Sequence, residues 1–371
     1  MKIGVPKEIK NHEYRVGMIP ASVRELYSHG HQVFIESHAG AGIGFSDNDY
    51  IAAGASILPT AKEIYSIADM IVKVKEPQST ERALLKPGQI LFTYLHLAPD
   101  FPQTEDLIKS KAICIAYETV TDNMGRLPLL APMSEVAGRM SIQAGAQTLE
   151  KSHGGSGLLL SGVPGVMPAK VLILGGGVVG SNAARMAVGL RADVTILDKN
   201  IDTLRKLDEE FQGSAKVAYS TRELLDQLVT EADLIIGAVL VPGAAAPKLI
   251  NKQHLTTMKP GSALVDVAID QGGCFESSHA TTHADPTYIV DNIVHYCVAN
   301  MPGAVARTST FALNNATLPY ILKLANKGYR QALLEDAGFL KGLNVIDGKL
   351  TIKEVAEEFS LPYIDARQAL E

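Results

Sequence analysis

The sequence predicts an α/β protein with parallel sheets, in which one domain is discontinuous along the chain and a second domain is inserted into it. Short apolar runs rich in branched residues alternate with amphipathic segments almost from end to end, which is the rhythm of βαβ units. The 371 residues are enough for about two or three domains. The C-terminal tail is too short to form its own core, so we expect it to pack on the first domain.

In the first third of the chain, the apolar runs predict strands and the segments between them predict helices. The run Pro132–Ser152 favours a long connecting helix, because it has no internal proline and only two weak glycine positions. A glycine-rich segment, HGGSGLLLSGVPGVMP, follows it. The predicted strands are Lys2–Val5, Gln32–Glu36, Met70–Val74, Gln89–Tyr94 and Ala112–Tyr117, and the predicted helices include Pro20–His29 and Phe101–Ser110.

A second βαβ series follows this break and ends in a long helical stretch over Thr308–Ala337 and a short helix near Ile352–Phe359. Its predicted strands are Lys170–Leu174, Asp193–Leu197, Lys216–Tyr219, Asp233–Gly237 and Ala263–Val267, and its predicted helices are Val178–Leu190, Ile201–Phe211, Thr221–Leu228 and Asn251–Met258.

Composition limits the partners and the compartment. With 34 basic and 40 acidic residues, a net charge of −6 and no basic cluster, neither nucleic acid nor an anionic membrane is an expected partner. The uncharged stretch Leu234–Pro247 is interrupted by glycine and proline and is shorter than the roughly 20 residues of a membrane span. The opening MKIGVPKEIK lacks the apolar run of a secretion signal. Cys114, Cys274 and Cys297 form no CxxC pair, so we expect buried, reduced thiols in a cytoplasmic protein.

The strongest local signal is the segment KVLILGGGVVG, residues 170–180. Gly175, Gly177 and Gly180 match G-x-G-x-x-G directly after a predicted strand and directly before a predicted helix. In a dinucleotide-binding turn, the first glycine permits the tight turn and the second lets the backbone approach the pyrophosphate. The third lets helix and strand pack closely. A glycine-rich turn without a ligand is the less favoured interpretation.

Two further features support a dinucleotide. The first amides of the predicted helix, near Val178 and Val179, would face the phosphates. Asp198, at the end of the next predicted strand, is placed to accept hydrogen bonds from the adenosine ribose, and its charge would repel a 2′-phosphate. The sequence therefore predicts NAD as the cofactor in preference to NADP.

Four ionisable residues stand in apolar or turn-like surroundings. Lys75 and Asp270 each end a predicted strand, where parallel sheets present functional side chains, although a solvated lysine and a turn-forming aspartate are the simpler interpretations. His96 follows the apolar strand ILFTYL and suits proton transfer near neutrality, although a lone histidine there is more often structural. Arg15 lies in KNHEYRVGMIP.

Other constellations are weaker. His279 and His283 have an i, i+4 spacing with Asp285 nearby, but SSHATTHADP has the composition of a loop, so we predict no metal site. The chain contains no GxSxG, P-loop or HExxH motif.

Several of these segments together resemble bacterial L-alanine dehydrogenases in order along the whole chain. The resemblance lies in MKIGVPKEIKNHEYRVGMIP, VKVKEP, YLHLA, MSEVAGRMSIQAGA, VLILGGGVVG and ALVDVAIDQGGC. It implies two Rossmann-like domains joined by long helices, with a substrate domain over 1–128 and 307–371 and an NAD-binding domain over 129–306. It also implies reversible, NAD-dependent oxidative deamination of L-alanine to pyruvate and ammonium in a cytoplasmic homo-oligomer, usually a hexamer.

The resemblance also implies roles for individual residues. Arg15 would bind the substrate carboxylate, which a guanidinium contacts with two parallel hydrogen bonds. Lys75 would lie close to the carbonyl oxygen of pyruvate, His96 would exchange a proton with the oxygen of the carbinolamine, and Asp270 would assist ammonia or water. The cofactor contacts would be Ser134, Gly175, Gly177, Val178, Val179, Gly180, Asp198, Ser220, Val239, Leu240, Val267, Ala268, Ile269, Val298, Ala299, Asn300 and Met301. Position 279, a histidine here where similar proteins often have a longer basic residue, is left out.

Three other functions fit parts of the pattern. One is the NAD-binding extramembrane component of a proton-translocating transhydrogenase, which shares the two-domain architecture, but we expect no membrane span after Glu371. Another is an amino- or imino-acid dehydrogenase of the saccharopine or lysine type. The third is a non-catalytic NAD sensor, which the combined Lys75, His96 and Asp270 set disfavours.

Overall fold

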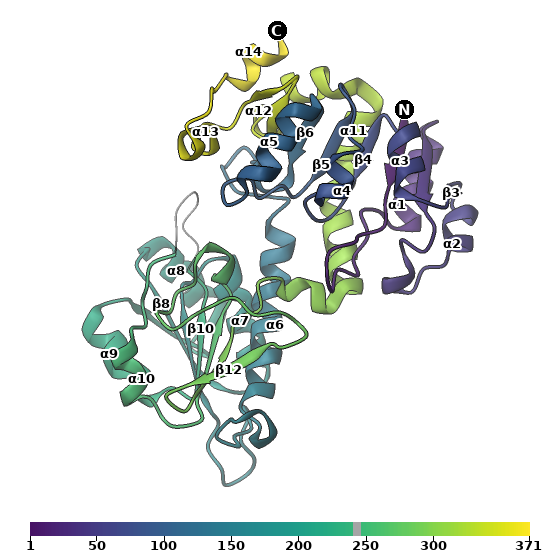
Figure 1. Cartoon of the computed structure of the whole chain (residues 1–371). Coiled ribbons are helices and arrows are strands. Elements are labelled where there is room, and N and C mark those ends of the chain that lie inside the picture. The colour runs from purple at the N-terminus through teal and green to yellow at the C-terminus, as the bar shows by residue number, and fades with distance from the viewer. Residues whose placement is uncertain (240–245) are drawn as a thin grey trace. The chain divides into compact units, whose positions relative to one another are not determined.

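The computed structural model describes residues 1–239 and 246–371 and contains two compact α/β units, each built on a mixed but mostly parallel sheet. The first unit comprises Met1–Met133 and Val305–Glu371, and the second comprises Ser134–Ala304 (Figure 1). The predicted α/β fold class is confirmed.

The sheet of the first unit has the strand order β15-β14-β6-β5-β4-β1-β2-β3. The six strands from the N-terminal part are parallel to one another, whereas β14 runs antiparallel to β6, with Leu343 opposite Ile115. The strands are β1 (Lys2–Val5), β2 (Gln32–Glu36), β3 (Ser56–Leu58), β4 (Met70–Val72), β5 (Ile90–Thr93), β6 (Ile113–Ala116), β14 (Leu343–Ile346) and β15 (Lys349–Leu350).

The C-terminal segment completes the first unit. Figure 1 shows its yellow end beside the blue β6, and Val345, Leu350 and Val355 share a buried core with Leu91 and Leu107. The helices of this unit are α1 (Pro20–Ser28), α2 (Asp47–Ala52), α3 (Ala61–Ile67), α4 (Ser79–Arg82), α5 (Phe101–Ser110), α11 (Ala306–Leu334), α12 (Ala337–Leu340), α13 (Lys353–Phe359) and α14 (Ala366–Leu370).

The described part of the second unit forms a sheet with the order β12-β13-β11-β10-β7-β8-β9. The order reverses at β7, which pairs with both β8 and β10, and such a reversal is where ligands bind in open parallel sheets. The strands are β7 (Lys170–Leu174), β8 (Asp193–Asp198), β9 (Lys216–Tyr219), β10 (Leu234–Gly237), β11 (Ala263–Asp266), β12 (Thr287–Val290) and β13 (Ile293–Tyr296).

The helices of the second unit begin where the sequence supplies capping side chains. Asn200, Thr221 and Asn251 accept hydrogen bonds from the first turns of α8, α9 and α10, which satisfies amides that have no partner within the helix. The helices are α7 (Val178–Gly189), α8 (Ile201–Phe211), α9 (Arg222–Glu231) and α10 (Lys252–Thr257), and α6 (Ala131–Thr148) spans the boundary between the two units.

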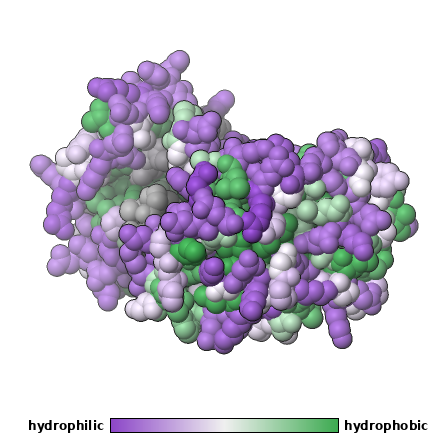
Figure 2. All heavy atoms as spheres, turned by 90° about the horizontal axis from the view of Figure 1, so that it is seen from above, coloured by the Kyte–Doolittle hydropathy of each residue, from purple (hydrophilic) through white to green (hydrophobic). Residues whose placement is uncertain are grey.

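The cysteines lie inside the protein, and the face drawn in Figure 2 is mostly hydrophilic. All three cysteines are buried and free, which confirms the prediction of buried thiols. On the face that Figure 2 presents, hydrophilic side chains predominate and apolar ones form smaller groups among them. Among the described helices, none is both long and apolar enough to cross a membrane.

Candidate active site

The G-x-G-x-x-G turn joins β7 to α7 where the strand order reverses. Gly175 has a φ of +100°, and a Cβ on Gly180 would lie 1.8 Å from the carbonyl oxygen of Gly175. A Cβ on Gly177, by contrast, would meet no atom within 4 Å. The turn thus leaves open space at the position where this motif brings its backbone to a pyrophosphate, so the residues present fit a dinucleotide.

Asp198 ends β8 beside this turn. One carboxylate oxygen accepts the Gly176 amide at 2.6 Å, and the other accepts the Asn200 amide at 2.8 Å. A carboxylate offers about four acceptor positions, so Asp198 retains capacity for ribose hydroxyls. At the start of α7, Val178 is 45% exposed, which leaves the first turn of the helix accessible to an anion.

Other predicted cofactor residues follow strands of the same sheet. The Ser220 amide, after β9, donates to the Asp198 carbonyl at 2.9 Å, and the Val267 amide, after β11, donates to the Gly237 carbonyl at 3.0 Å. Because parallel strands end at one edge, the structure brings these residues together with the glycine turn. Ser134 lies in α6, and Leu240 lies outside the described residues. At the same edge are Val239 after β10, Ala268 and Ile269 after Val267, and Val298, Ala299, Asn300 and Met301 after β13.

Asp270 lies in a 3-10 turn, Ile269–Gln271, immediately after the end of β11. Gly272 and Gly273 have φ values of +88° and +78°, and the Gly273 amide donates to the Ala268 carbonyl at 3.0 Å. The turn therefore reverses the chain through two left-handed glycine positions and leaves the Asp270 side chain exposed at the carboxyl edge of the sheet.

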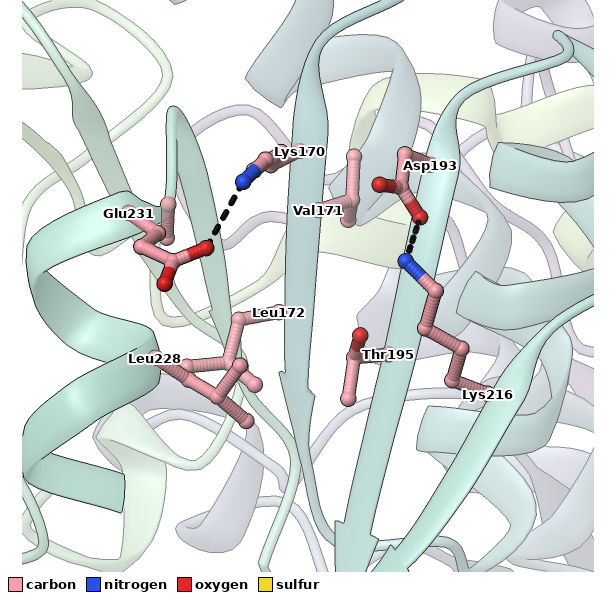
Figure 3. Close-up of a pocket in the computed structure, with 9 residues that line it drawn as sticks. Lys170, Val171, Leu172, Asp193, Thr195, Lys216, Leu228 and Glu231 are labelled. Carbon is pink, nitrogen blue, oxygen red and sulfur yellow. Dashed lines mark hydrogen bonds and ion pairs between the residues drawn. The ribbon is translucent and has the colours of Figure 1, made fainter. Parts of the chain in front are cut away.

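A small cavity of about 80 Å³ in the same unit lies elsewhere (Figure 3). Lys170, Asp193 and Lys216, which line it, are the first residues of β7, β8 and β9. Two largely exposed ion pairs, Lys170–Glu231 and Lys216–Asp193, border it. The cavity therefore lies at the amino ends of strands whose carboxyl ends carry the glycine turn, and it is separate from the candidate site.

In the first unit, Arg15 forms a two-point ion pair with Glu13. Its Nε and Nη2 atoms donate to the two carboxylate oxygens of Glu13 at 2.7 and 2.6 Å, and Nη1 contacts the sulfur of Met133 at 3.2 Å. Arg15 is 3% exposed. Burial acts to lower the pKa of the guanidinium, but the hydrogen bonds and charge of Glu13 outweigh it and raise the pKa. Arg15 thus carries a fixed positive charge in a fixed orientation.

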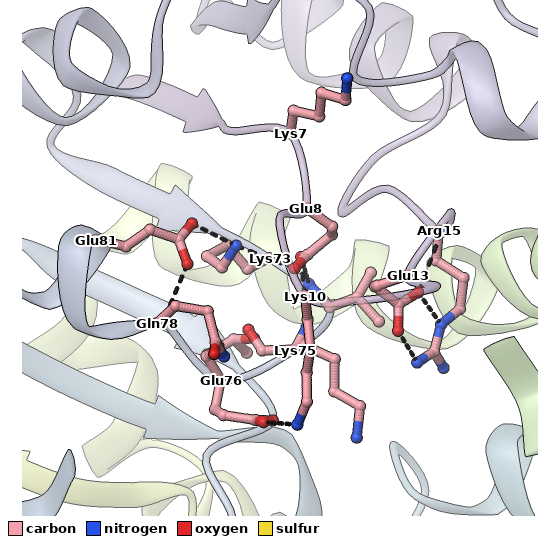
Figure 4. A network of polar contacts seen from close by, with 12 residues as sticks. Lys7, Glu8, Lys10, Glu13, Arg15, Lys73, Lys75, Glu76, Gln78 and Glu81 are labelled. Atoms are coloured by element: carbon pink, nitrogen blue, oxygen red, sulfur yellow. Dashed lines mark hydrogen bonds and ion pairs between the residues drawn. The ribbon is translucent and has the colours of Figure 1, made fainter. Parts of the chain in front are cut away.

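Lys75 follows β4 and lies in a network of charged side chains (Figure 4). The Lys75 ammonium makes no hydrogen bond or ion pair with any residue that the structure describes, whereas each acid around it has another cation. Burial lowers the pKa of the Lys75 ammonium, against the opposing effect of Glu76, and the charges of Arg15 and Lys10 lower it further. Glu8 and Glu81 pair with Lys73, Glu76 pairs with Lys10, and Glu13 pairs with Arg15.

His96 follows β5 in a left-handed backbone conformation, with a φ of +50°. The Glu118 carboxylate accepts the amides of His96 at 2.6 Å and Leu95 at 3.1 Å, which stabilises this conformation. The imidazole stacks on the Tyr94 ring, with 5.8 Å between ring centroids. Strands β1, β4 and β5 are neighbours, so Arg15, Lys75 and His96 all lie in segments that follow the carboxyl ends of adjacent parallel strands.

The histidines of the loop after β11 have structural partners. The His279 ring stacks on Tyr288 at 3.7 Å, and His283 Nε2 lies 2.7 Å from the Asn300 carbonyl oxygen. Within residues 1–239 and 246–371, no group of three or more His, Cys, Asp or Glu side chains could hold a metal ion.

The acids that hold the candidate residues were not predicted from the sequence. Glu13 orients Arg15, Glu118 fixes the backbone of His96, and Glu8 accepts the Lys75 amide at 3.3 Å. The sequence offered one signal for these buried charges, which is the charged residue Lys73 inside the apolar run MIVKVK. Glu8 and Glu118 stand in segments whose composition singles out no acidic residue.

The sheet reversal, the open glycine turn and the charged loops at strand ends define a two-domain α/β protein with a nucleotide-binding unit. Two family models match: the alanine dehydrogenase/PNT N-terminal domain over residues 4–137 and the C-terminal domain over 141–353. The chain belongs to the alanine dehydrogenase/PNT family.

Full-length relatives agree with this assignment. An alanine dehydrogenase of Halomonas elongata is 62% identical over 366 residues, covering 99% of each chain. An alanine dehydrogenase of Methanococcus maripaludis is 56% identical and covers 100% of each chain. A solved structure titled L-alanine dehydrogenase superposes with a TM-score of 0.94 at 54% identity, covering 97% of this chain and 99% of the other. A transhydrogenase structure from Sinorhizobium meliloti shares the fold, with a TM-score of 0.81 at 22% identity, covering 95% and 99%.

Proposed function

We propose that this chain catalyses the reversible, NAD-dependent oxidative deamination of L-alanine to pyruvate and ammonium. The observation that carries the proposal is the open G-x-G-x-x-G turn in a chain whose full-length relatives are alanine dehydrogenases. The substrate domain is assigned to 1–128 and 307–371, and the nucleotide domain to 129–306. Arg15, Lys75 and His96 belong to the first of these and Asp270 to the second.

The nucleotide domain would hold NAD at the carboxyl edge of its sheet. The Gly175–Gly180 turn and the first amides of α7 would contact the pyrophosphate, and Asp198 would accept the adenosine ribose hydroxyls. The negative charge of Asp198 disfavours the 2′-phosphate of NADP. When bound, NAD accepts the hydride from the alanine Cα.

The substrate domain supplies positive charge for an anionic substrate. Arg15, already oriented by Glu13, would bind the alanine carboxylate. Lys75, whose ammonium is left without a carboxylate among the described residues, would donate to the oxygen that becomes the pyruvate carbonyl. Arg15 holds alanine in one orientation for transfer of the hydride. Lys75 acts after water has added to the imine, at the oxygen that becomes the carbonyl.

Hydrolysis of the resulting imine needs proton transfers at two atoms. Water adds to the imine carbon, and His96 would exchange a proton with the oxygen of the carbinolamine. Asp270 would assist the water or the departing ammonia at the same carbon. The nitrogen leaves as ammonium, and the oxygen from water becomes the pyruvate carbonyl.

Steady-state kinetics test these roles. His96→Ala and Asp270→Asn should each lower kcat for alanine oxidation by about 10²–10⁴-fold, because each removes one proton-transfer group. Both variants should bind NAD nearly as wild type does, as measured by fluorescence titration. Near-wild-type turnover in either variant contradicts the role given to that residue.

The same assay tests cofactor and substrate choice. Wild-type enzyme should reduce NAD faster than NADP, and should oxidise alanine faster than serine, glycine or bulky amino acids. Equal rates with bulky side chains would point to a related dehydrogenase of the saccharopine or lysine type. Hydride transfer to a second nucleotide, only with membrane partners, would point to a transhydrogenase component.

We further propose that the chain acts in the cytoplasm as a homo-oligomer, and the resemblance to bacterial L-alanine dehydrogenases favours a hexamer. Light scattering coupled to size-exclusion chromatography would give the mass in solution. A monomeric mass at working concentration contradicts this proposal.

A further inference from the structure

The turn that carries Asp270 is fixed at its far end by a buried carboxylate. Asp266, the last residue of β11, is completely buried. Its Oδ2 atom accepts the Cys274 amide at 2.8 Å, the Phe275 amide at 3.3 Å and the Ser278 hydroxyl at 2.5 Å. Asp266 thus joins the strand that enters the turn to the segment that leaves it.

A lysine holds the same segment through its carbonyl groups. The Lys248 ammonium donates to the carbonyl oxygens of Gly272, of Gly273 at 2.9 Å and of Phe275 at 3.1 Å. The backbone beside it adds a bond from the Leu249 amide to the Cys274 carbonyl at 2.7 Å. Lys248 is an exposed residue, so its side chain does not fill space in the core.

The two charges meet on one peptide group. The peptide between Gly273 and Cys274 gives its carbonyl oxygen to Lys248 and its amide to Asp266. Opposite charges at the two ends of a peptide dipole fix its orientation, because rotation of the peptide would place each end against a group of the wrong polarity.

The fit around Asp266 leaves little freedom. A Cβ on Gly273 would lie 2.6 Å from Asp266 Oδ2, and a Cβ on Gly237 would lie 3.1 Å from Oδ1. The Val267 amide also donates to the Gly237 carbonyl at 3.0 Å. Both ends of the turn are therefore tied to the sheet, and the exposed Asp270 lies on the short stretch between them.

We propose that Asp266 and Lys248 are positioning residues for the deamination, acting as a two-sided clamp that holds Asp270 in place. The inference rests on the proposed function, in which Asp270 assists water or ammonia at the reacting carbon. A rigid turn keeps an exposed carboxylate at one location, and misplacement of a reacting group by about 1 Å is enough to cost about 10²-fold in rate.

Substitutions on each side of the clamp test the inference. Asp266→Asn and Lys248→Met should each lower kcat for alanine oxidation by about 10- to 100-fold. NAD affinity should change less than kcat, because Val267, Ala268 and Ile269 are the cofactor residues that lie in this turn, whereas the pyrophosphate and ribose contacts lie on β7, α7 and β8. Lys248→Arg should recover part of kcat, since a guanidinium also donates to carbonyl groups.

The second unit offers a matched pair for control. Asp233 is 6% exposed, accepts the Lys170 amide at 2.7 Å and pairs with Lys259 at 2.7 Å, just before β10 at the opposite edge of the sheet. Asp233→Asn and Lys259→Met also remove a buried carboxylate charge and a lysine. They should leave kcat within about twofold of wild type, because no reacting group depends on them.

Two readouts separate positioning from general destabilisation. In an Asp270→Asn background, adding Asp266→Asn or Lys248→Met should cause no further loss of the residual kcat, because both act through Asp270. Hydrogen exchange followed by mass spectrometry should show faster exchange of peptides covering 267–276 in both single variants and not in the controls. This second measurement does not depend on alanine turnover.

The outcomes are distinguishable. Hydrogen exchange at 267–276 that is as slow in Asp266→Asn and Lys248→Met as in wild type overturns the clamp, whether or not the chain oxidises alanine. Faster hydrogen exchange with an unchanged kcat overturns the positioning role. The role is also overturned if the clamp substitutions lower kcat by the same factor in the wild-type and Asp270→Asn backgrounds. If Asp266→Asn does not fold, Lys248→Met carries the same test from the exposed side. A wild-type chain that does not oxidise alanine would instead contradict the proposed function.

Discussion

At the scale of single residues, the three glycines of the nucleotide turn differ in what a side chain would meet. Gly180 packs against the backbone of Gly175, whereas Gly177 faces open space. Gly180 is required by the fold of the unit, whereas Gly177 is required only if the proposed pyrophosphate binds there. A methyl group at each therefore has a different consequence.

Gly177→Ala should leave stability nearly unchanged but weaken NAD binding by about tenfold or more, equivalent to about 1.4 kcal/mol, because the methyl group occupies the approach of the pyrophosphate. Gly180→Ala should destabilise the protein. Gly189→Ala, on the same helix with no atom within 4 Å of its Cβ, is the control that should affect neither. Thermal unfolding and NAD titration measure the two effects. An unchanged NAD affinity in Gly177→Ala would show that the pyrophosphate does not bind at this turn.

The lowered pKa of Lys75 predicts a pH dependence for binding of the keto acid. An amine whose pKa lies below the ordinary value of 10.5 loses its proton, and therefore its positive charge, at a lower pH than other lysines do. The affinity for an anionic pyruvate analogue such as oxamate, in the presence of NADH, should fall as pH rises toward 10.5. In Lys75→Arg the affinity should stay flat, because arginine remains charged. A wild-type affinity that is constant over this range contradicts the prediction.

The sequence was sufficient to predict the glycine turn and the acid beside it, but not the acids that support the other candidate residues. Gly175, Gly177, Gly180 and Asp198 form a local pattern with a known physical purpose, and the structure brings them together. The acids that hold Lys75 and His96 lie far from them in sequence: Glu8 contacts Lys75 across β1 and β4, and Glu118 contacts His96 across β5 and β6. Such pairs depend on strand order, which a local pattern does not contain.

At the scale of secondary-structure elements, the end of β4 depends on a buried ionic cluster of Lys73, Glu8 and Glu81 (Figure 4). Lys73 is 0% exposed and donates to Glu8 at 3.0 Å and to Glu81 at 2.7 Å. Glu8 also accepts the Val74 amide at 2.7 Å. Burial raises the pKa of Glu8, and the charge of Lys73 opposes that rise. The cluster therefore joins β1 to β4 just before Lys75.

Lys73→Met should lower the free energy of unfolding by about 3–5 kcal/mol, because it leaves two buried carboxylates without a cation. Lys323→Met, which breaks an exposed pair with Asp336, should cost less than about 1 kcal/mol. Since the chain has no tryptophan, urea unfolding followed by circular dichroism is the suitable measurement. Equal midpoints for the two variants would show that the buried cluster contributes no more than a surface ion pair.

The sequence predicted most strands of the βαβ units, but not the short parallel strand β3, and it did not predict the hairpins. The limits of β1, β2, β7 and β9 match the predicted ranges. The hairpins that were not predicted are β12 with β13 and β14 with β15, which are short antiparallel pairs. Their turns, Asp291-Asn292 and Asp347-Gly348, have positive φ at both positions, as type I′ hairpins require. The turn signals were present, but βαβ periodicity does not detect such hairpins.

At the scale of the whole molecule, the first unit takes its strands from both ends of the chain. Residues 1–133 supply β1 to β6, while α11 and β14 come from the segment after residue 304. The second unit is continuous from Ser134 to Ala304. This difference in continuity affects the order in which the two units can become complete.

During synthesis on the ribosome, chain emerges from the N-terminus at about 5–20 residues per second. The segment 1–133 emerges first but lacks β14, so β6 keeps an unpaired edge while the second unit is made and completes its own sheet. That interval lasts on the order of tens of seconds. The second unit can therefore fold before the first, and until then the open edge of β6 is a further edge at which nascent chains can pair with one another.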